Sequence, residues 1–219
     1  MLNILITGGC GYIGSHVACL LNKLGHYVIV YDNFANSKRS QIKILDKICT
    51  GTITYVEGDV CDSELMYSTL QKFKVDAVIH MAGLKYVGDS VTSPLSYYEV
   101  NVAGTTSLIG AMGKAGVKKL VFSSSATVYG EPNYLPIDEE HRALPINPYG
   151  RTKYYIEEFL KDIAIADSEW SIVCLRYFNP AGSHESGLIG DELTSKAENV
   201  FPMIGKVAIG KIPKLTVFG

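Results

Sequence analysis

The sequence has no long hydrophobic run, because no apolar stretch approaches the roughly 18 residues that a membrane-spanning helix needs. It also has no excess of charge, with 20 Lys and Arg against 22 Asp and Glu and a net charge of −2. This balance excludes a general nucleic-acid binder and a polybasic membrane-surface protein. Since 47% of the residues are hydrophobic, it is also not a disordered chain. We therefore expect a globular protein with neither nucleic acid nor membrane as a partner.

Paired cysteines are missing as well. The five cysteines are an odd number, are widely spread and form no CxxC pair: Cys10, Cys19, Cys49, Cys61 and Cys174. This pattern supports neither a disulfide framework nor a zinc site, and the histidines have no metal-like spacing, so we expect no metal. The first residues, 1–6, lack the positive region and cleavage site of a signal peptide. Free thiols fit a reducing compartment, and we predict a cytoplasmic protein.

What the sequence does contain is a regular alternation of short apolar runs with segments of helical period. The runs predict strands at 2–7, 27–31, 52–57, 77–81, 120–124 and 171–176. The helical segments are 17–24, which stops at Gly25, then 63–73, 97–115 and 149–166. Such βαβα alternation predicts an α/β fold with a doubly wound, mostly parallel sheet that is covered on both faces.

The pattern becomes irregular after about residue 177, where Asn179-Pro180-Ala181-Gly182 and the segment 187–190 follow. We therefore predict a nucleotide-binding domain at 1–177 and the start of a substrate-binding region at 178–219. The sequence stops at Gly219, directly after a strand-like run at 215–218. We expect a truncated chain, whose small C-terminal substrate lobe is largely missing.

A glycine-rich motif, Thr7-Gly8-Gly9-Cys10-Gly11-Tyr12-Ile13-Gly14, follows the first predicted strand and opens the first predicted helix. In this context glycines allow a tight turn and close approach of a pyrophosphate, which lies at the helix N-terminus. Asp32 ends the second strand 18 positions later, where a carboxylate accepts hydrogen bonds from ribose hydroxyls and favours NAD over NADP. Lys38 and Arg39 follow closely and keep NADP open. The motif predicts a Rossmann-type dinucleotide site.

Two further strand ends carry candidate contacts. Asp59-Val60 ends the third strand, where a carboxylate could reach an adenine amino group. Met81-Ala82-Gly83-Leu84-Lys85 closes the fourth, where small residues permit backbone approach to a flat ligand and the lysine could meet a phosphate or a ribose. His80 lies within that strand, and we expect a packed core histidine.

The strongest chemical signal is a serine-rich strand end followed by a Tyr–Lys pair. Ser123-Ser124-Ser125-Ala126-Thr127-Val128-Tyr129-Gly130 ends the fifth strand, at the edge where doubly wound sheets bind ligands. Tyr149-Gly150-Arg151-Thr152-Lys153 then opens a helix, and the i, i+4 spacing places Tyr149 and Lys153 on one face. A nearby ammonium lowers the pKa of a phenol, as does a positive nicotinamide ring, so we expect Tyr149 to act as a base near neutral pH.

Together with Tyr177-Phe178-Asn179-Pro180, these motifs resemble the extended short-chain dehydrogenase/reductase superfamily. Within it, Gly11-Tyr12-Ile13-Gly14-Ser15-His16, Tyr31-Asp32-Asn33 and Ala82-Gly83-Leu84-Lys85 are similar to the UDP-glucose 4-epimerase family. The resemblance runs through the whole chain and includes Glu198-Asn199-Val200-Phe201-Pro202, where that family more often has Asn-Asn-Leu.

The resemblance implies NAD as cofactor, a UDP-hexose as substrate and interconversion of UDP-glucose and UDP-galactose, and it leaves a homodimer open. The catalytic residues that it implies are Ser125, Tyr149 and Lys153. The implied cofactor residues are Gly8, Gly11, Tyr12, Ile13, Gly14, Asp32, Asn33, Phe34, Ala35, Asn36, Ser37, Asp59, Val60, Met81, Ala82, Gly83, Leu84, Lys85, Asn101, Tyr149, Lys153, Tyr177 and Phe178. The implied substrate residues are Lys85, Ser125, Tyr149, Asn179, Asn199, Val200, Thr216, Val217 and Phe218.

Alternatives remain beside this interpretation. Related dehydratases carry an Asp-Glu pair in the serine segment, and Ser124-Ser125-Ala126 lacks it, which argues against dehydration. Another nucleotide-sugar oxidoreductase or epimerase of the superfamily would use the same residues. From a different class, the chain could be an inactive NAD-binding fragment. Acceptance of N-acetylated sugars cannot be predicted, because the residues that usually decide it would lie beyond Gly219.

Overall fold

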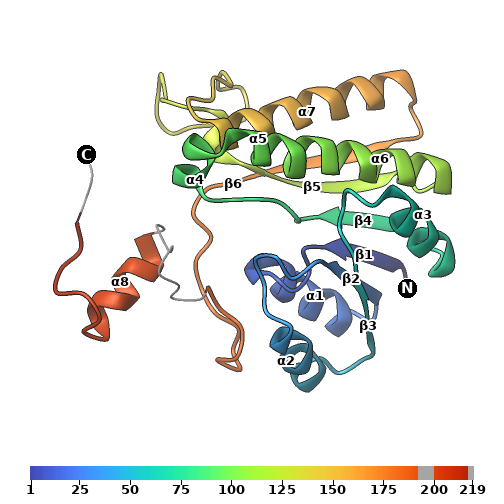
Figure 1. The fold of residues 1–219 in the computed structure, drawn as a ribbon, viewed down its shortest axis with the longest axis horizontal. Coiled ribbons are helices and arrows are strands. Elements are labelled where there is room, and N and C mark those ends of the chain that lie inside the picture. Colours follow the sequence, from blue (N-terminus) through green and yellow to red (C-terminus); the bar gives the residue numbers. More distant parts are fainter. Residues whose placement is uncertain (192–199, 217–219) are drawn as a thin grey trace. The chain divides into compact units, whose positions relative to one another are not determined.

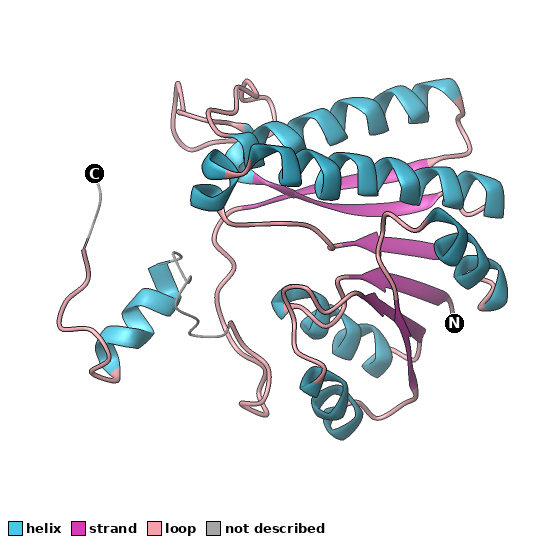
Figure 2. Cartoon of the chain, in the orientation of Figure 1, coloured by secondary structure: helices cyan, strands magenta, loops and turns pink. Residues whose placement is uncertain are grey.

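The computed structural model describes residues 1–191 and 200–216. The chain divides into two compact units, Met1–Phe178 and Asn179–Gly219. The first unit holds every strand of the sheet, and Figures 1 and 2 show its layers.

A six-stranded parallel sheet forms the centre of the first unit, in the order β3-β2-β1-β4-β5-β6. The order reverses between β1 and β4, and in doubly wound sheets the ligand lies at the carboxyl ends of the strands beside this point. The sequence prediction of a doubly wound parallel sheet is therefore confirmed. The strands are β1 (Asn3–Thr7), β2 (Tyr27–Asp32), β3 (Ile53–Glu57), β4 (Ala77–His80), β5 (Lys119–Ser125) and β6 (Ser171–Tyr177).

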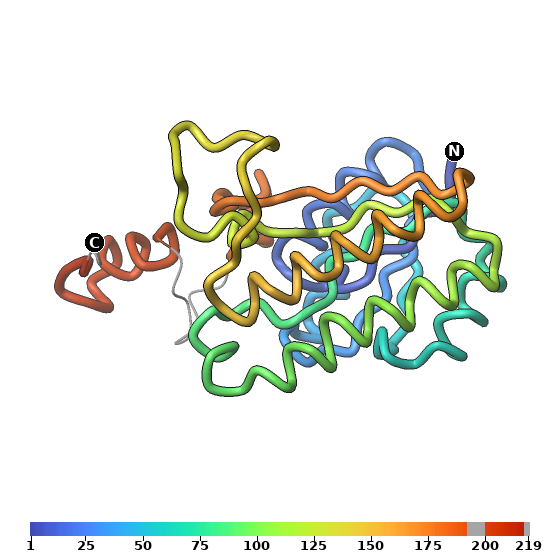
Figure 3. The backbone as a smooth tube through the Cα atoms, turned by 90° about the horizontal axis from the view of Figure 1, so that it is seen from above, coloured from blue at the N-terminus to red at the C-terminus, as the bar shows by residue number. Residues whose placement is uncertain are grey.

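Helices connect the strands and cover the sheet. Helices α6 and α7 run alongside each other over one face (Figures 1 and 3). A π-helical turn, η1 (Tyr98–Ala103), leads directly into α6, and a 3-10 turn, η2 (Ala126–Val128), follows β5. The α-helices are α1 (Tyr12–Lys23), α2 (Ser40–Ile48), α3 (Ser63–Lys72), α4 (Val87–Thr92), α5 (Pro94–Tyr97), α6 (Gly104–Ala115), α7 (Pro148–Ala166) and α8 (Val200–Ala208).

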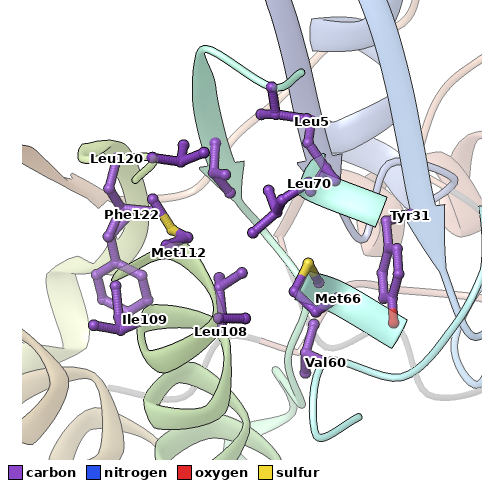
Figure 4. Close-up of a cluster of buried hydrophobic side chains, with 14 of the residues drawn as sticks. Leu5, Tyr31, Val60, Met66, Leu70, Leu108, Ile109, Met112, Leu120 and Phe122 are labelled. Carbon is purple, nitrogen blue, oxygen red and sulfur yellow. The ribbon is translucent and has the colours of Figure 1, made fainter. Parts of the chain in front are cut away.

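The main hydrophobic core lies between the sheet and helices α3, α6 and α7 (Figure 4). Leu5, Leu120 and Phe122 from the strands meet Met66 and Leu108 from the helices, and each is at most 2% exposed. Strands buried on both faces are almost continuously apolar, as in the segment 3–7. This packing holds the carboxyl ends of β1, β4 and β5 in place.

The opposite face is covered only in part within this unit. Helices α1 and α2 pack against β1, β2 and β3. On β6, Val173 is 49% exposed and Leu175 is 38% exposed. Helices therefore lie on both faces of the sheet, as the sequence predicts, and within this unit α1 and α2 cover the half formed by β1, β2 and β3.

The predicted strands and the four predicted helices are present, with ends shifted by a few residues. Gly25, with φ +82°, follows α1 as its predicted terminator. The sequence interpretation missed α2, α4, α8 and all of α5 but its last residue, Tyr97. Helix α2 buries only Leu45, so its apolar period is weak, and α8 contains Pro202, a residue tolerated only in the first turn.

The second unit contains a bend and a helix. Ser183 and Gly190 form an antiparallel bridge, and His184 N–H donates to the Ile189 carbonyl at 2.8 Å. The predicted strand-like run at 215–218 is not a strand at Leu215 and Thr216, which pair with no described residue. Its other two residues lie outside the described part.

Within the described residues, no helix combines the length and the apolar character that a membrane crossing requires.

The core makes a stability prediction. Leu108 is completely buried, so Leu108→Ala should lower the free energy of unfolding by about 2–5 kcal/mol, through lost burial and the cavity left behind. Leu20→Ala, at a position 56% exposed on α1, is the matched control and should change it by less than about 1 kcal/mol. Urea unfolding followed by circular dichroism measures both. Equal losses would contradict the assignment of the core.

Candidate active site

The glycine motif forms a turn that links β1 to α1. Gly8 has φ +66°, and its N–H donates to the Tyr31 carbonyl at 2.8 Å. A Cβ at Gly8 would lie 2.8 Å from the backbone nitrogen of Ala82, and one at Gly14 would lie 2.3 Å from the carbonyl oxygen of Gly8. Both positions require glycine, because fixed backbone occupies the space that a side chain would fill. The N-terminus of α1, which leaves its first N–H groups without partners in the helix, begins directly behind this turn.

Asp32 is bound to this turn from the end of β2. Its carboxylate accepts hydrogen bonds from Cys10 N–H, Phe34 N–H and the Ser37 hydroxyl, each at 2.9 Å. The side chain is 7% exposed. Asp32 therefore orients the glycine turn and the following loop together. A buried carboxylate beside a phosphate-binding turn fits a nucleotide whose ribose carries free hydroxyls.

Arg39 is one of the two cations that left NADP open as the cofactor, and the structure shows which groups hold its side chain. The guanidinium of Arg39 forms a two-bond ion pair with the Glu57 carboxylate and lies 4.7 Å from the centroid of the Phe34 ring. This pair raises the pKa of Arg39 and lowers that of Glu57. An arginine held by a carboxylate is less available to a 2′-phosphate, which favours NAD.

The loop after β2 contacts the end of β3. Asn33 donates from its side-chain amide to the Asp59 carboxylate at 2.8 Å, and Cys61 N–H donates to the same carboxylate at 2.8 Å. These hydrogen bonds lower the pKa of Asp59. Ala35 and Asn36 are exposed, and Val60 is buried. Whether Asp59 meets adenine stays a prediction.

His80 links the end of β4 to its neighbours and is 2% exposed. Thr105 donates its hydroxyl proton to the Asn101 carbonyl at 2.5 Å, so its oxygen accepts from Nε2 of His80 at 2.9 Å. Nδ1 then accepts from the Thr7 hydroxyl at 2.7 Å. Burial lowers the pKa of His80 to about 3, with a smaller contribution from Lys153, so the ring is neutral. The expectation of a packed core histidine is confirmed.

The loop 81–85 is fixed by Thr7 and Asn101. The Thr7 hydroxyl oxygen accepts from the N–H groups of Met81 and Ala82, both at 3.2 Å. Asn101, buried in the π-helical turn, accepts from Leu84 N–H at 2.8 Å and donates to the Leu84 carbonyl at 3.1 Å. Its amide also reaches the Thr152 hydroxyl on α7, at 3.2 Å. Such π-helical irregularities are frequent at functional sites.

Three exposed or half-buried residues complete the predicted cofactor set. Lys85 is exposed, and its ammonium lies 5.6 Å from the centroid of the Tyr86 ring. Tyr177 ends β6 and is half-buried. Phe178 is 61% exposed and stacks on Tyr129, with ring centroids 6.4 Å apart. Their contact with a cofactor stays a prediction.

The start of α7 brings Tyr149 to the serine strand. The Asn147 side chain caps the helix by accepting from Gly150 N–H at 2.8 Å. A Cβ at Gly150 would lie 2.7 Å from the Thr127 carbonyl oxygen, so this glycine lets the first turn approach η2 closely. The predicted neighbourhood of Tyr149 and Ser125 is thus present, with Ser125 close enough to influence the pKa of the phenol.

Lys153 is buried one turn further along the same helix, at 5% exposure. Its ammonium donates to the Ser123 carbonyl at 2.7 Å and lies 4.8 Å from the centroid of the Phe122 ring. It lies 5.8 Å from the centroid of the Tyr149 ring. Burial lowers the pKa of Lys153 to about 8, although the Glu157 charge opposes this. The lysine is thus a buried cation beside a phenol.

Burial raises the pKa of Tyr149, and the contact with Ser125 lowers that pKa by less. The net effect of the protein groups alone favours the neutral phenol, because desolvation opposes the charged form. The role of Tyr149 as a base stays a prediction. Deprotonation of Tyr149 near neutral pH needs additional positive charge beside the phenol, which an oxidised nicotinamide ring carries.

The residues implied for the substrate belong mostly to the second unit. Asn179 and Thr216 are exposed, and Val200 begins α8. Asn199, Val217 and Phe218 lie outside the described residues. The substrate roles of all six stay predictions. In the described ranges, no three His, Cys, Asp or Glu side chains are grouped as a metal site would need.

Sequence reasoning missed a buried ionic group behind the serine strand. Glu157 on α7 accepts a hydrogen bond from the Ser124 hydroxyl and from the guanidinium of Arg176 on β6. Glu157 is 8% exposed. Its position four residues after Lys153, on the same buried helix face, was the available signal.

The glycine turn yields a binding prediction. Gly14→Ala should weaken NAD⁺ binding by about tenfold or more, because the new methyl group would displace the Gly8 carbonyl and the turn with it. Gly110→Ala is the matched control, since a Cβ there meets nothing within 4 Å, and it should leave affinity unchanged. Isothermal titration calorimetry measures both dissociation constants. Equal affinities would remove the turn from the cofactor site.

Comparison with known proteins agrees with this geometry. The chain is 48% identical over 219 residues to the UDP-glucose 4-epimerase of Yersinia enterocolitica, covering 100% of this chain and 65% of the relative. It is 47% identical to that of Bacillus subtilis, covering 99% and 64%. The chain thus spans about 65% of the length of the curated relatives it matches.

Solved structures give the same result. The UDP-glucose 4-epimerase of Stenotrophomonas maltophila, with bound NAD and formylated UDP-arabinopyranose, superposes with a TM-score of 0.97 at 42% identity, covering 100% of this chain and 65% of that one. The enzyme of Bifidobacterium longum, in complex with NAD⁺ and UDP, gives 0.92 at 42% identity, covering 99% and 65%.

The model of one protein family matches residues 4–219, almost the whole chain. With the Rossmann-type sheet, the glycine turn and the Ser–Tyr–Lys cluster in place, the chain belongs to the NAD dependent epimerase/dehydratase family.

Proposed function

We propose that the protein interconverts UDP-glucose and UDP-galactose with NAD as its cofactor. The observation that carries the proposal is the cluster of Ser125, Tyr149 and Lys153, built on the end of β5 and the start of α7. Relatives and solved structures that are named UDP-glucose 4-epimerase support it at 42–48% identity.

Two features distinguish this activity from its alternatives. The position after Ser125 is Ala126, and the serine segment has no acid that could expel water, which disfavours dehydration. The hydroxyl of Ser125 is anchored by the N–H and hydroxyl of Thr127, at 3.2 and 3.0 Å. A fixed hydroxyl beside a phenol suits a sugar hydroxyl that loses and regains its proton.

In the proposed mechanism, Tyr149 takes the proton from the O4 hydroxyl of the hexose and later returns it. Ser125 hydrogen-bonds to O4 and keeps it beside the phenol. Lys153 holds the cofactor ribose and, as a cation, favours the ionised phenol. Bound NAD would supply a hydride acceptor at C4 of the sugar and, after rotation of the 4-keto sugar, a hydride donor to its opposite face, so that the cofactor ends unchanged.

The glycine turn, Asp32 and the loop 81–85 are the proposed cofactor contacts in this mechanism. Each is held by hydrogen bonds within the protein before any ligand arrives. Such a site loses little freedom on binding, so it favours affinity and correct placement of the reacting ring.

We further propose a cytoplasmic homodimer. The five cysteines, all among the described residues, are free thiols, which fits a reducing compartment. On α7, Tyr155 is 49% exposed and Ile165 is 74% exposed, which suits a helical contact between two copies. Analytical ultracentrifugation distinguishes a dimer from a monomer.

Tyr149→Phe tests the mechanism, because it removes the proposed proton acceptor. Conversion of UDP-galactose should fall by about 10²-fold or more, since a positioned base contributes that much. Tyr155→Phe is the control on the same helix and should retain the rate. Proton NMR of the anomeric signals measures UDP-glucose formation directly.

The same assay separates the alternatives. NADH formed in an amount equal to the sugar consumed would assign a net oxidoreductase instead. If the wild-type chain converts no UDP-galactose, the alternative of an inactive NAD-binding fragment is favoured. An unchanged rate in Tyr149→Phe would remove Tyr149 from the chemistry.

A further inference from the structure

A buried ionic group lies behind the proposed catalytic residues, on the side of the sheet that α7 covers. Ser124 on β5 and Arg176 on β6 are register partners in neighbouring strands. Both donate to the carboxylate of Glu157 on α7. One carboxylate thus joins the carboxyl ends of two strands to the helix that carries Tyr149 and Lys153.

The hydrogen bonds to Glu157 have the geometry of a strong pair. The Arg176 Nη2 donates to Oε2 at 2.7 Å, and Nε lies 3.1 Å from both carboxylate oxygens. The Ser124 hydroxyl donates to Oε1. Two-pronged contacts of this kind fix both position and orientation. The Arg176 guanidinium also lies 4.8 Å from the centroid of the Tyr129 ring.

Glu157 lies four residues after Lys153 and eight after Tyr149, so the three side chains share one helix face. Lys153 is 5% exposed, and within the described residues its ammonium has one hydrogen-bond acceptor, the Ser123 carbonyl. A buried cation with a single neutral acceptor is poorly compensated. The Glu157 charge favours the ammonium form of Lys153.

We infer that Glu157 is a positioning residue for the proposed reaction: it holds the end of β5 against α7 and supplies the negative charge that keeps the buried Lys153 a cation. This inference rests on the proposed function for the role of Lys153. In this inference, Ser124 and Arg176 hold the Glu157 carboxylate in position and do not contact substrate or cofactor.

The other titratable groups around Lys153 do not replace this charge. His80 on β4 is neutral, with its pKa lowered to about 3. Tyr149 on α7 is held neutral by burial. On β6, burial raises the pKa of the Cys174 thiol to about 11, and Arg176 is a cation. Strand β5 contributes only the Ser123 carbonyl and the Phe122 ring. Among the described groups facing Lys153, Glu157 is thus the anion.

The test is the dissociation constant of NAD⁺ measured by calorimetry between pH 6 and 10. In the wild-type chain the affinity should fall as the pH rises through about 8, where Lys153 loses its proton. In Glu157→Gln, which keeps the shape but removes the charge, the midpoint of this fall should move to lower pH by about one unit.

Ser124→Ala is the matched control, because it removes one hydrogen bond to the same carboxylate and leaves the charge. It should lower the melting temperature but leave the midpoint where the wild type has it. A purely structural Glu157 would make both variants less stable and move neither midpoint. Glu157→Asp keeps the charge but moves it away by one methylene, so its midpoint should lie between those of the wild type and Glu157→Gln. This variant replaces Glu157→Gln in the test if Glu157→Gln does not fold.

The outcomes separate this inference from the proposed function. An equal midpoint in wild type and Glu157 variants, or a wild-type affinity that does not change with pH, would overturn the inference. The midpoint of NAD⁺ affinity could shift in the Glu157 variants as expected while the wild-type chain converts no UDP-galactose. That result would overturn the proposed function alone, since NAD⁺ binding does not depend on the sugar.

Discussion

The hydrogen bond from the Lys153 ammonium to the Ser123 carbonyl joins the two elements on which the site is built. It places a buried cation between the end of β5 and the first turns of α7. Tyr149 lies one turn before Lys153, and Ser125 lies two residues after Ser123. The hydrogen bond between Lys153 and Ser123 therefore brings the side chains of Tyr149 and Ser125 close together. The Asn147 cap and the close approach at Gly150 set where α7 begins and how near it comes.

The glycine turn, Asp32 and the loop 81–85 form the proposed cofactor side of the site, at the point where the strand order reverses. Asp32 binds the glycine turn and the following loop at once, and Thr7 binds His80 and the loop 81–85. These hydrogen bonds are internal to the protein, so the loops are shaped by the sheet and not by the ligand. Burial opposes the charged forms of Lys153 and Tyr149. These are two of the residues proposed for the chemistry, and shifted pKa values are typical of such positions.

Much of this could be predicted from the sequence. The apolar runs predicted every strand of the sheet, and the glycine motif, Asp32 and the Tyr–Lys spacing predicted which strand ends meet. Local pattern was sufficient there, because the residues of each motif are close in sequence. The spacing of Glu157 after Lys153 indicates a buried position, but it does not identify its partners, Ser124 and Arg176. The three residues come from three elements, and only the packing of α7 on the sheet brings them together. A spacing motif also does not contain the burial that raises the pKa of Tyr149.

The most direct test of this account is the NAD⁺ dissociation constant of Lys153→Met compared with Lys161→Met, an exposed position on the same helix. The account predicts that Lys153→Met weakens binding by about tenfold or more, the value of a hydrogen bond to a charged group. Lys161→Met should bind as the wild type does. Wild-type affinity in Lys153→Met would contradict the claim that the buried ammonium holds the cofactor.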